Sequence, residues 1–177
     1  MGYSGLIQWT GNKRAHIHYS MDITGQKNTQ SQLEYLASTD MLTGALNRAT
    51  ILGSLQTVLS EARKKEGIVS LVFVGLNRLK WINATFGHDT GDQALFHTVQ
   101  AIRSCTQRVD VTGRYSGSDF LVILPGCAKG MARVRIVQSK SILSRLNLLG
   151  SQGAVSFSVG IADNMELPYA ETAAYYG

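Results

Sequence analysis

The sequence predicts an α+β (mixed α/β) fold, in which a central mixed β-sheet of about five strands is flanked by helices and preceded by an N-terminal hairpin and a helix. Short apolar runs rich in β-branched residues alternate with longer segments of helical periodicity. Two of the runs, Val109–Tyr115 and Phe120–Leu124, are separated only by small residues, which is typical of a hairpin. Hairpin-paired strands combined with helical crossovers predict a mixed sheet.

The expected elements follow one another in a regular order. We expect N-terminal strands at 6–9 and 16–21, followed by a polar helix that ends near residue 38. The elements expected after it are a helix at Ala49–Lys65, a strand at Ile68–Val74, helices at Arg78–Phe86 and Asp92–Ser104, the hairpin Val109–Leu124, a helix at Ala128–Leu148 and a strand at Val155–Ile161. The cluster Arg63-Lys64-Lys65 ends the first long helix favourably, because basic side chains stabilise a helix C-terminus.

Length and charge limit the classes of function. The 177 residues can bury one good core, and a normal domain size remains without the first forty or so. The net charge of +5 is compatible with a nucleotide-phosphate ligand. The basic residues are scattered rather than striped, so we expect no nucleic-acid partner.

Cysteine usage and hydropathy indicate a cytoplasmic chain. Cys105 and Cys127 lack metal-ligand or redox spacing and are therefore interpreted as reduced intracellular thiols. No stretch approaches the roughly twenty apolar residues of a membrane span, and the N-terminus does not resemble a signal peptide. We expect no membrane contact by this chain, although its parent protein could be membrane-anchored.

Five motifs occur in register between Asp40 and Ala162. They are the runs at 40–48 (DMLTGALNR), 75–83 (GLNRLKWIN), 86–92 (FGHDTGD), 116–120 (SGSDF) and 156–162 (SFSVGIA). In order and spacing they resemble the GGDEF family of diguanylate cyclases, which carries D-x-L-T-G-x-x-N-R, D-x-D-x-F-K-x-x-N, F-G-H-x-x-G-D, the signature turn and a late strand. The resemblance implies the palm-like nucleotidyl-cyclase GGDEF fold over residues 40–177.

The metal positions that the resemblance implies are altered in this chain. Family members join two GTP molecules into cyclic di-GMP, and their metal ions are held by the first Asp after the early strand and by the acidic third position of the signature turn. Gly75 and Ser118 stand at these positions. Neither supplies the carboxylate oxygen that Mg²⁺ prefers, and metal assistance is worth several kcal/mol. We therefore expect a degenerate catalytic site, with Asp119 a weak candidate ligand and Mg²⁺ binding weak.

The guanine-contacting positions of the family are preserved as Asn83 and Asp92. A carboxylate can accept hydrogen bonds from guanine N1–H and N2–H₂, and an Asn amide can both donate and accept. Two structural alternatives stay open: Asp92 as the N-cap of the following helix, and Asn83 as a polar residue on a helix surface.

Phosphate contacts are expected where the early strand gives way to a helix. In the turn Gly75-Leu76-Asn77, the backbone N–H groups of Leu76 and Asn77 and the positive end of the helix dipole would face phosphates. Lys80 matches the phosphate-side lysine of the family, with a solvated surface lysine as its alternative.

In the family that these motifs resemble, product feedback acts through an R-x-x-D site just before the signature turn. Here the window is Gln107–Asp110, so Asp110 is present and Gln107 replaces the Arg. Gln lacks the planar fork by which Arg binds phosphate, and Arg108 is one residue late. We expect this inhibitory site to be non-functional. Arg114 has a family counterpart too, with pairing to a neighbouring carboxylate as its alternative role.

The two ends of the chain carry further expectations. Residues 1–24, ending in Asp22-Ile23-Thr24, resemble the C-terminal end of a PAS sensor domain, and 25–39 form a linker or signalling helix. Family members usually close with a segment that supplies phosphate-binding Lys and Arg. Neither residue type occurs after Ile161, so that segment is either cut short or diverged.

The favoured function is therefore a degenerate, non-catalytic GGDEF domain, with GTP as its candidate ligand, that couples a PAS sensor to a partner. The candidate partners are a second copy in a homodimer or a downstream EAL phosphodiesterase domain. A weak diguanylate cyclase and a nucleotide-blind interaction scaffold are the alternatives.

Overall fold

The computed structural model describes residues 2–9, 13–20 and 35–165. The chain divides into two compact units, Met1–Ala37 and Ser38–Gly177. In the first unit, strands β1 (Gly2–Trp9) and β2 (Lys13–Ser20) form an antiparallel hairpin, as expected from the sequence. Most of the predicted linker at 25–39 lies outside the described residues, as does the chain after residue 165, although residues 35–38 are helical. The assignment to a PAS domain stays a prediction.

The second unit contains the helices and strands predicted from the motifs. In chain order they are α2 (Arg48–Lys65), β3 (Val69–Leu76), α3 (Leu79–Phe86), α4 (His88–Arg103), β4 (Val111–Arg114), β5 (Asp119–Pro125), α5 (Lys129–Arg145), a short 3₁₀ helix (Gly150–Gln152) and β6 (Phe157–Asp163). Every predicted element is present, with boundaries displaced by up to four residues.

The sheet of this unit has the strand order β4-β5-β3-β6, and all neighbouring strands are antiparallel. The fold class is confirmed, but the expected mixed sheet of about five strands is corrected to four antiparallel ones among the described residues. The reason is that each pair of parallel strands joined through helices has a third, antiparallel strand between its members. Strands β3 and β4 run in the same direction with β5 between them, and β5 and β6 run in the same direction with β3 between them, which is a split β-α-β arrangement.

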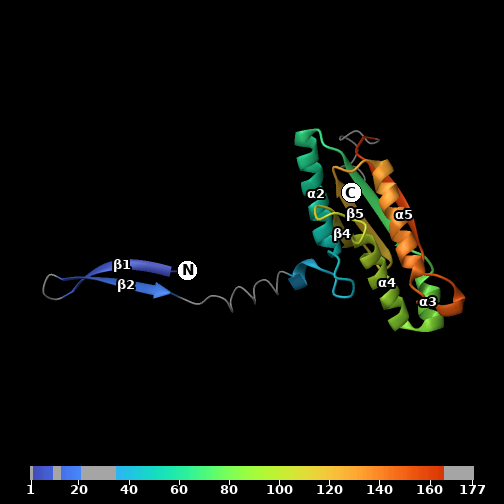
Figure 1. Cartoon of the computed structure of the whole chain (residues 1–177), viewed down its shortest axis with the longest axis horizontal. Helices are drawn as coiled ribbons and strands as arrows, with labels where there is room; N and C mark the ends of the chain where they lie inside the picture. Colours follow the sequence, from blue (N-terminus) through green and yellow to red (C-terminus); the bar gives the residue numbers. More distant parts are fainter. Residues whose placement is uncertain (1, 10–12, 21–34, 166–177) are drawn as a thin grey trace. The chain divides into compact units, whose positions relative to one another are not determined.

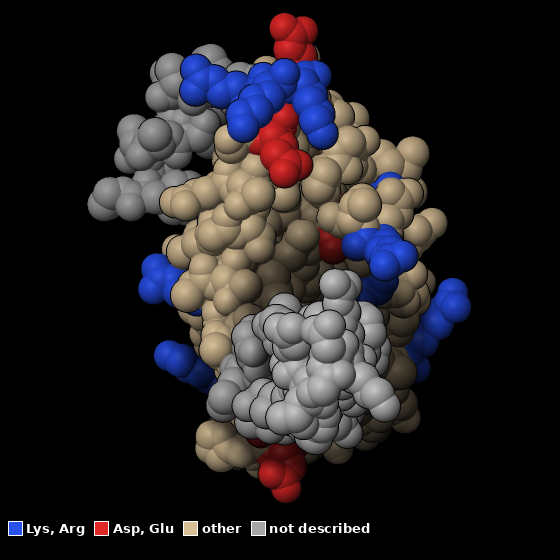
Figure 2. Space-filling model, turned by 90° about the vertical axis from the view of Figure 1, so that its left-hand side faces the viewer, with Lys and Arg blue, Asp and Glu red and all other residues tan. Residues whose placement is uncertain are grey.

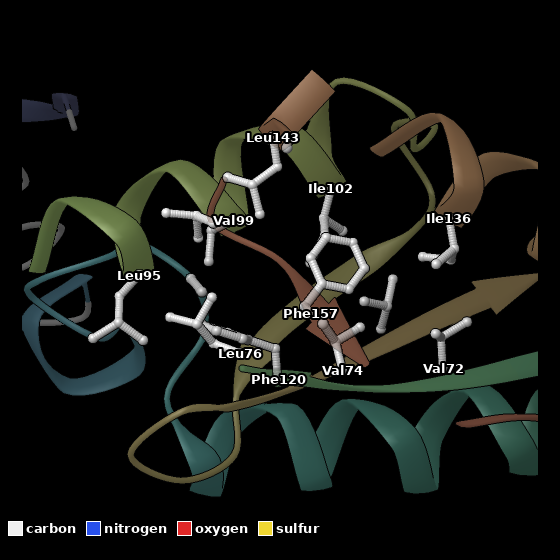
Figure 3. Close-up of a cluster of buried hydrophobic side chains, with 14 of the residues drawn as sticks. Val72, Val74, Leu76, Leu95, Val99, Ile102, Phe120, Ile136, Leu143 and Phe157 are labelled. Carbon is white, nitrogen blue, oxygen red and sulfur yellow. The ribbon is translucent and has the colours of Figure 1, made fainter. Parts of the chain in front are cut away.

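Helices cover both faces of the sheet, with α2 on one side and α4 with α5 on the other (Figure 1). Side chains alternate along the central strand, so Val72, Val74 and Leu76 enter the larger core while Val69 and Leu71 face α2. Figure 3 shows the larger core, in which β3 and β5 meet helices α4 and α5. Its labelled members are Val72, Val74, Leu76, Leu95, Val99, Ile102, Phe120, Ile136, Leu143 and Phe157.

Local signals explain where the helices begin and end. Asn47 caps α2, because its side-chain oxygen accepts a hydrogen bond of 3.0 Å from the N–H of Thr50. The predicted basic cluster does lie in the last turn of α2. Gly87, with φ of 86°, ends α3 and directly precedes α4. A positive φ of this size favours glycine, so Gly87 lets the two helices follow one another without a longer loop.

Three further features of the described residues are the distribution of basic side chains, the state of the cysteines and the hydropathy of the helices. Figure 2 shows Lys and Arg side chains at separate places on the face that it views, without a continuous stripe. Both cysteines are free thiols, and burial raises the pKa of Cys127. In the part of the chain that the structure describes, no helix has the length and apolar character needed to span a membrane.

The packing of α2 against β4 depends on one glycine. A Cβ atom at Gly113 would lie 2.4 Å from the Cβ of Ile51, which is fully buried. The segment before α2 also bonds beside β4, since the N–H of Leu46 donates to the Thr112 carbonyl at 3.1 Å and the N–H of Arg114 donates to the Leu46 carbonyl at 2.7 Å. Helix and strand are therefore held too close together for any side chain at position 113.

Gly113→Ala should lower the free energy of unfolding by about 1–3 kcal/mol, because the added methyl group forces α2 away from the sheet. Urea denaturation measures this change. Gly160→Ala is the matched control, since nothing lies within 4 Å of a Cβ at that strand glycine. Equal stability of the two variants would contradict the close contact.

Candidate functional site

The two turns that correspond to the family's metal site converge in this fold. Gly75 and Asp119 are directly paired across β3 and β5. A Cβ atom at Gly75 would lie 3.3 Å from Oδ1 of Asp119. The N–H of Leu76 donates to the carbonyl of Ser118 at 2.9 Å, which joins the end of β3 to the signature turn. The positions predicted as degenerate, Gly75 and Ser118, are therefore brought together with the candidate ligand Asp119.

The donor atoms at this point do not fit a magnesium ion. Mg²⁺ requires several oxygen ligands in octahedral geometry and is usually held through carboxylates. Asp119 supplies one carboxylate, and its Oδ2 accepts a hydrogen bond from the hydroxyl of Ser116. Between residues 35 and 165, no three His, Cys, Asp or Glu side chains gather as a metal-binding group. The site offers too few oxygen donors to hold the cation by itself.

Arg114 ties the signature turn to the first motif. Its Nη1 donates to both oxygens of Asp40 at 3.1 and 3.2 Å, and its Nη2 donates to the Gly117 carbonyl at 2.7 Å. Thr43 donates to Asp40 from its N–H at 2.9 Å and from its hydroxyl at 2.7 Å. Of the two roles considered for Arg114, pairing with a carboxylate is confirmed. The guanidinium is thus engaged in holding the turn.

The charge state of Asp40 follows from these contacts. Burial by itself raises the pKa of Asp40, but the two hydrogen bonds from Thr43 and the neighbouring charge of Arg114 together hold that pKa below its ordinary value. The carboxylate is therefore ionised at neutral pH. A lowered pKa in the folded protein means that the link stabilises the fold above the titration range of an unfolded Asp.

The predicted guanine-contacting residues lie on neighbouring helices that pack closely. A Cβ atom at Gly91 of α4 would lie 1.8 Å from Oδ1 of Asn83 on α3. That oxygen is buried, and no described residue donates a hydrogen bond to it. Asp92 follows Gly91 directly and is exposed. The helix pair therefore buries an amide oxygen that has no described donor, and the residue next to the contact point is an accessible aspartate.

Both structural alternatives for these residues are wrong. Asp92 is not an N-cap, because α4 begins at His88, four residues earlier, after the turn at Gly87. Asn83 is not simply a surface polar residue, because its Oδ1 is buried against Gly91. Sequence reasoning missed the role of Gly91. A glycine within a helical pattern is a signal of close packing and could have indicated it.

The phosphate-facing groups are placed less favourably than the sequence suggested. The N–H of Leu76 is bonded to Ser118, and the N–H of Asn77 donates to the Ser156 carbonyl at 2.9 Å. The side chain of Asn77 is also held, since its Nδ2 donates to the Ser156 hydroxyl and its Oδ1 accepts from the Ser158 hydroxyl. The expectation that these two N–H groups face phosphates is therefore not met.

The start of α3 retains groups that could meet a phosphate. Lys80 is exposed in the first turn of this helix. Arg78 precedes the helix with φ of 59°, and its guanidinium lies 3.9 Å from the centre of the Trp81 ring. First-turn N–H groups of a helix have no partner within the helix. A phosphate contact here would use them together with Lys80.

The window that corresponds to the inhibitory site is a turn, not a strand. The N–H of Asp110 donates to the Gln107 carbonyl at 3.0 Å, so β4 begins only at Val111. Oδ2 of Asp110 accepts from the Gln107 N–H at 2.6 Å and from Nη1 of Arg135 at 2.9 Å. Its side chain is fully buried. Asp110 thus has its arginine partner on α5, a residue that sequence reasoning missed.

Gln107 and Arg108 are both exposed beside this turn. A cavity of about 390 Å³ lies here, and its lining includes Arg103, Arg108 and Asp110. Arg108, which stands one residue after the family's Arg position, lies in the turn rather than on a strand. Arg103 also donates to the Gly44 carbonyl at 2.7 Å. No Arg stands where the family's R-x-x-D pattern has one.

Comparison with known proteins identifies the family. The sequence model described as "Diguanylate cyclase, GGDEF domain" matches residues 37–172. The chain belongs to the GGDEF family. The match spans most of the chain, including all five motifs, the converging turns at Gly75 and Asp119 and the helix pair that carries Asn83.

Relatives and solved structures agree with this assignment. The chain is 32% identical over 125 residues to the diguanylate cyclase DgcM of Escherichia coli, covering 70% of this chain and 30% of DgcM. It is 31% identical over 166 residues to the cyclic di-GMP phosphodiesterase PdeR of Escherichia coli, covering 87% of this chain and 24% of PdeR. The chain therefore spans less than a third of either protein.

Two solved GGDEF structures resemble the fold. The coiled coil and GGDEF domain of DgcB from Caulobacter crescentus superposes with a TM-score of 0.72 at 24% identity, covering 80% of this chain and 77% of that one. The GGDEF domain of PA1120 from Pseudomonas aeruginosa gives a TM-score of 0.66 at 30% identity, covering 72% and 76%. These likenesses confirm the GGDEF fold of the second unit.

Asp40→Asn should lower the free energy of unfolding by about 1–2 kcal/mol at pH 7, because the charged partner of Arg114 is lost. The pKa of Asp40 is lowered in the folded protein, so its contribution is complete above the unfolded pKa of about 3.9 and is lost as the pH falls through the folded pKa. The difference in Tm between wild type and variant should therefore be constant from about pH 5.5 to 7 and shrink below about pH 4.

Differential scanning calorimetry across this pH range tests the prediction. Glu61→Gln, at an exposed position of α2, is the control, because it also removes a carboxylate but at a site remote from the signature turn. A Tm difference for Asp40→Asn that persisted unchanged at pH 3 would show that the carboxylate charge is unimportant.

Proposed function

We propose that this chain is a catalytically degenerate GGDEF domain that acts as a GTP-binding regulatory module in cyclic di-GMP signalling. The observation that carries the proposal is the pairing of Gly75 with Asp119 across β3 and β5. Phosphoryl transfer depends on neutralising charge at the reacting phosphate. With one carboxylate, already bonded to Ser116, the converged turns lack the means to do so.

Guanine recognition is the part of the site best supported. The buried Oδ1 of Asn83 has no donor among the described residues, and leaving such a group unpaired costs about 1–3 kcal/mol. The exposed carboxylate of Asp92 can accept from guanine N1–H and N2–H₂. Adenine lacks that donor edge, so a site built from these groups favours GTP over ATP. Lys80 and the first turn of α3 would lie on the phosphate side.

The regulatory role rests on how the domain is linked to its neighbours. In this proposal, a signal from a PAS sensor enters through the linker that ends near Asp40, and Arg114 passes it to the signature turn. The partner is a second copy or an EAL phosphodiesterase domain, and the relative PdeR is named a cyclic di-GMP phosphodiesterase. Product feedback has no role, because Arg135 engages Asp110 and Gln107 replaces the arginine.

A weak diguanylate cyclase is the second candidate. Its support is that DgcM and other relatives are named diguanylate cyclases, and that Asp119 points a carboxylate oxygen toward Gly75. Incubation with GTP and Mg²⁺ or Mn²⁺ distinguishes the two functions: the regulatory module makes no cyclic di-GMP above a blank, whereas the cyclase makes product that disappears with Asp119→Ala. A nucleotide-blind scaffold would show neither turnover nor binding.

GTP should bind at least tenfold more tightly than ATP, because the residues proposed to contact guanine are present. The dependence on Mg²⁺ should be modest, because the carboxylates that would hold the metal are missing. Asp92→Ala should abolish the preference by removing the acceptor for the guanine edge. Isothermal titration calorimetry with each nucleotide, with and without Mg²⁺, measures both effects.

Asp89→Ala is the matched control for this experiment, since Asp89 is an exposed aspartate near the start of the same helix. Gly91→Ala adds a second test, because its methyl group would displace the side chain of Asn83. Equal binding of GTP and ATP, or no binding of either at millimolar concentration, would favour the scaffold.

Gly75→Asp combined with Ser118→Glu should create Mg²⁺-dependent strengthening of GTP binding. The two substitutions place carboxylates beside Asp119, where β3 and the signature turn converge, and so return oxygen donors that can share a cation. The measurement is GTP affinity with and without Mg²⁺ in wild type and the double variant. Turnover is not required for this outcome.

Gly53→Asp with Ser144→Glu introduces the same side chains at exposed positions on α2 and α5, outside the converged turns, and serves as the control. It should leave the response to Mg²⁺ unchanged. The same lack of response in a folded Gly75→Asp, Ser118→Glu variant would mean that the two positions cannot share a metal ion.

A further inference from the structure

The phosphate end of the proposed nucleotide site can be traced from its guanine end. Asn83, whose buried Oδ1 has no described donor, lies on α3. Lys80 lies about one turn earlier on the same helix and is exposed. A helix rises about 1.5 Å per residue, so the start of α3 lies roughly 7 Å from Asn83 along the helix axis. A nucleotide with its base at Asn83 and its phosphates at the start of α3 spans this distance.

The backbone N–H groups at the end of β3 are already engaged within the protein. The N–H of Leu76 donates to the Ser118 carbonyl at 2.9 Å, and the N–H of Asn77 donates to the Ser156 carbonyl at 2.9 Å. Each of these hydrogen bonds joins β3 to another part of the fold. A phosphate group would have to break them in order to use the same donors, and it would leave the two carbonyl groups unpaired.

Two arginines beside the signature turn are engaged as well. Nη1 of Arg114 donates to both oxygens of Asp40, and its Nη2 donates to the Gly117 carbonyl. Nη2 of Arg48 donates to the Tyr115 hydroxyl at 3.4 Å, and the guanidinium of Arg48 lies 4.8 Å from the centre of that ring. The charge of Arg114 is therefore balanced by a carboxylate, and Arg48 is held against an aromatic ring.

The charge that the converged turns do present is negative. Oδ1 of Asp119 lies 3.3 Å from the position of a Cβ atom at Gly75. Neither Gly75 nor Ser118 brings a second carboxylate with which a cation could be held between Asp119 and a phosphate. Residues 162–177 include no Lys or Arg, so this part of the chain adds no positive charge. A phosphate group that approaches Asp119 therefore meets a like charge.

Positive charge at the start of α3 suits a single phosphate group. Lys80 is exposed in the first turn of this helix, and an ammonium group binds phosphate as a point charge. Arg78 places its guanidinium 3.9 Å from the centre of the Trp81 ring. The first phosphate of a nucleotide can therefore pair with Lys80, whereas a second and a third would extend toward Asp119.

We propose that this site selects guanine nucleotides by the base and the first phosphate, and that it binds GMP at least as tightly as GTP. The ligand class is a guanosine nucleotide with one phosphate group, bound without a metal ion held by the protein. The inference rests on the proposed contacts of Asn83 and Asp92 with guanine. It changes the signal that the domain reports, from the triphosphate alone to guanine nucleotides in general.

Isothermal titration calorimetry of the whole chain in EDTA tests the contributions of base and phosphates separately. GMP should bind at least tenfold more tightly than AMP, and GTP should bind no more than threefold more tightly than GMP. Asp119→Asn removes the negative charge and keeps an oxygen that can accept from the Ser116 hydroxyl. This variant should strengthen GTP binding at least threefold and leave GMP binding within twofold of the wild type.

Two further variants complete the experiment. Glu61→Gln, at an exposed position of α2, is the matched control for Asp119→Asn and should leave the binding of both nucleotides within twofold. Lys80→Ala should weaken GMP at least threefold and guanosine less than twofold, because guanosine has no phosphate group to lose a partner. The Tm of each variant without nucleotide shows whether it is folded.

Three results would overturn the inference while the guanine contacts still stand, provided that GMP binds at least tenfold more tightly than AMP. They are GTP binding more than threefold tighter than GMP in EDTA, an unchanged ratio of GTP to GMP affinity in folded Asp119→Asn, and equal weakening of GMP and guanosine in folded Lys80→Ala. Equal binding of GMP and AMP, or no binding of either, would instead refute the proposed guanine contacts and this inference with them.

Discussion

The central strand β3 is the element on which the rest of the second unit depends. It pairs with β5 on one side and β6 on the other, and its side chains enter the cores on both faces of the sheet. Its register therefore sets the register of its neighbours. The same pairing that buries Val72 and Val74 brings Gly75 opposite Asp119, so the chemistry of the converged turns follows directly from the packing of the core.

The metal-binding part and the base-contacting part of the proposed nucleotide site have separate physical requirements. Metal binding needs several oxygen donors at one point, and Gly75 and Ser118 supply no carboxylate there. The proposed base contacts depend instead on the close packing of α3 on α4, where position 91 leaves no space for a side chain. One function can therefore disappear while the other persists, because different contacts hold them.

Local patterns were sufficient to predict the helices and strands of this unit. Periodicity placed α2, β5 and α5, and the small residues at 116–118 marked the hairpin tip. The antiparallel pairing of all neighbours was not predicted, because whether a crossover skips a strand depends on the whole sheet rather than on any segment. The family resemblance supplied the convergence of the two turns, which no local pattern contains.

Long-range partners were the least predictable part of the site. Asp110 and Arg135 are 25 residues apart, and nothing in the sequence indicates that a residue of α5 reaches the turn before β4. The occupied N–H groups of Leu76 and Asn77 were missed for the same reason, since their acceptors lie on other strands. By contrast, the prediction of a helix that begins at Asp92 overlooked a local signal, the glycine at position 87.

The contact between Asp40 and Arg114 gives the domain an unusual mechanical property. The chain enters the folded unit at Ser38, and two residues later it is fastened to the guanidinium that also holds the Gly117 carbonyl. The entry point and the signature turn are therefore connected through the side chain of Arg114. A displacement of the incoming chain at Asp40 would therefore act directly on the guanidinium that holds the signature turn.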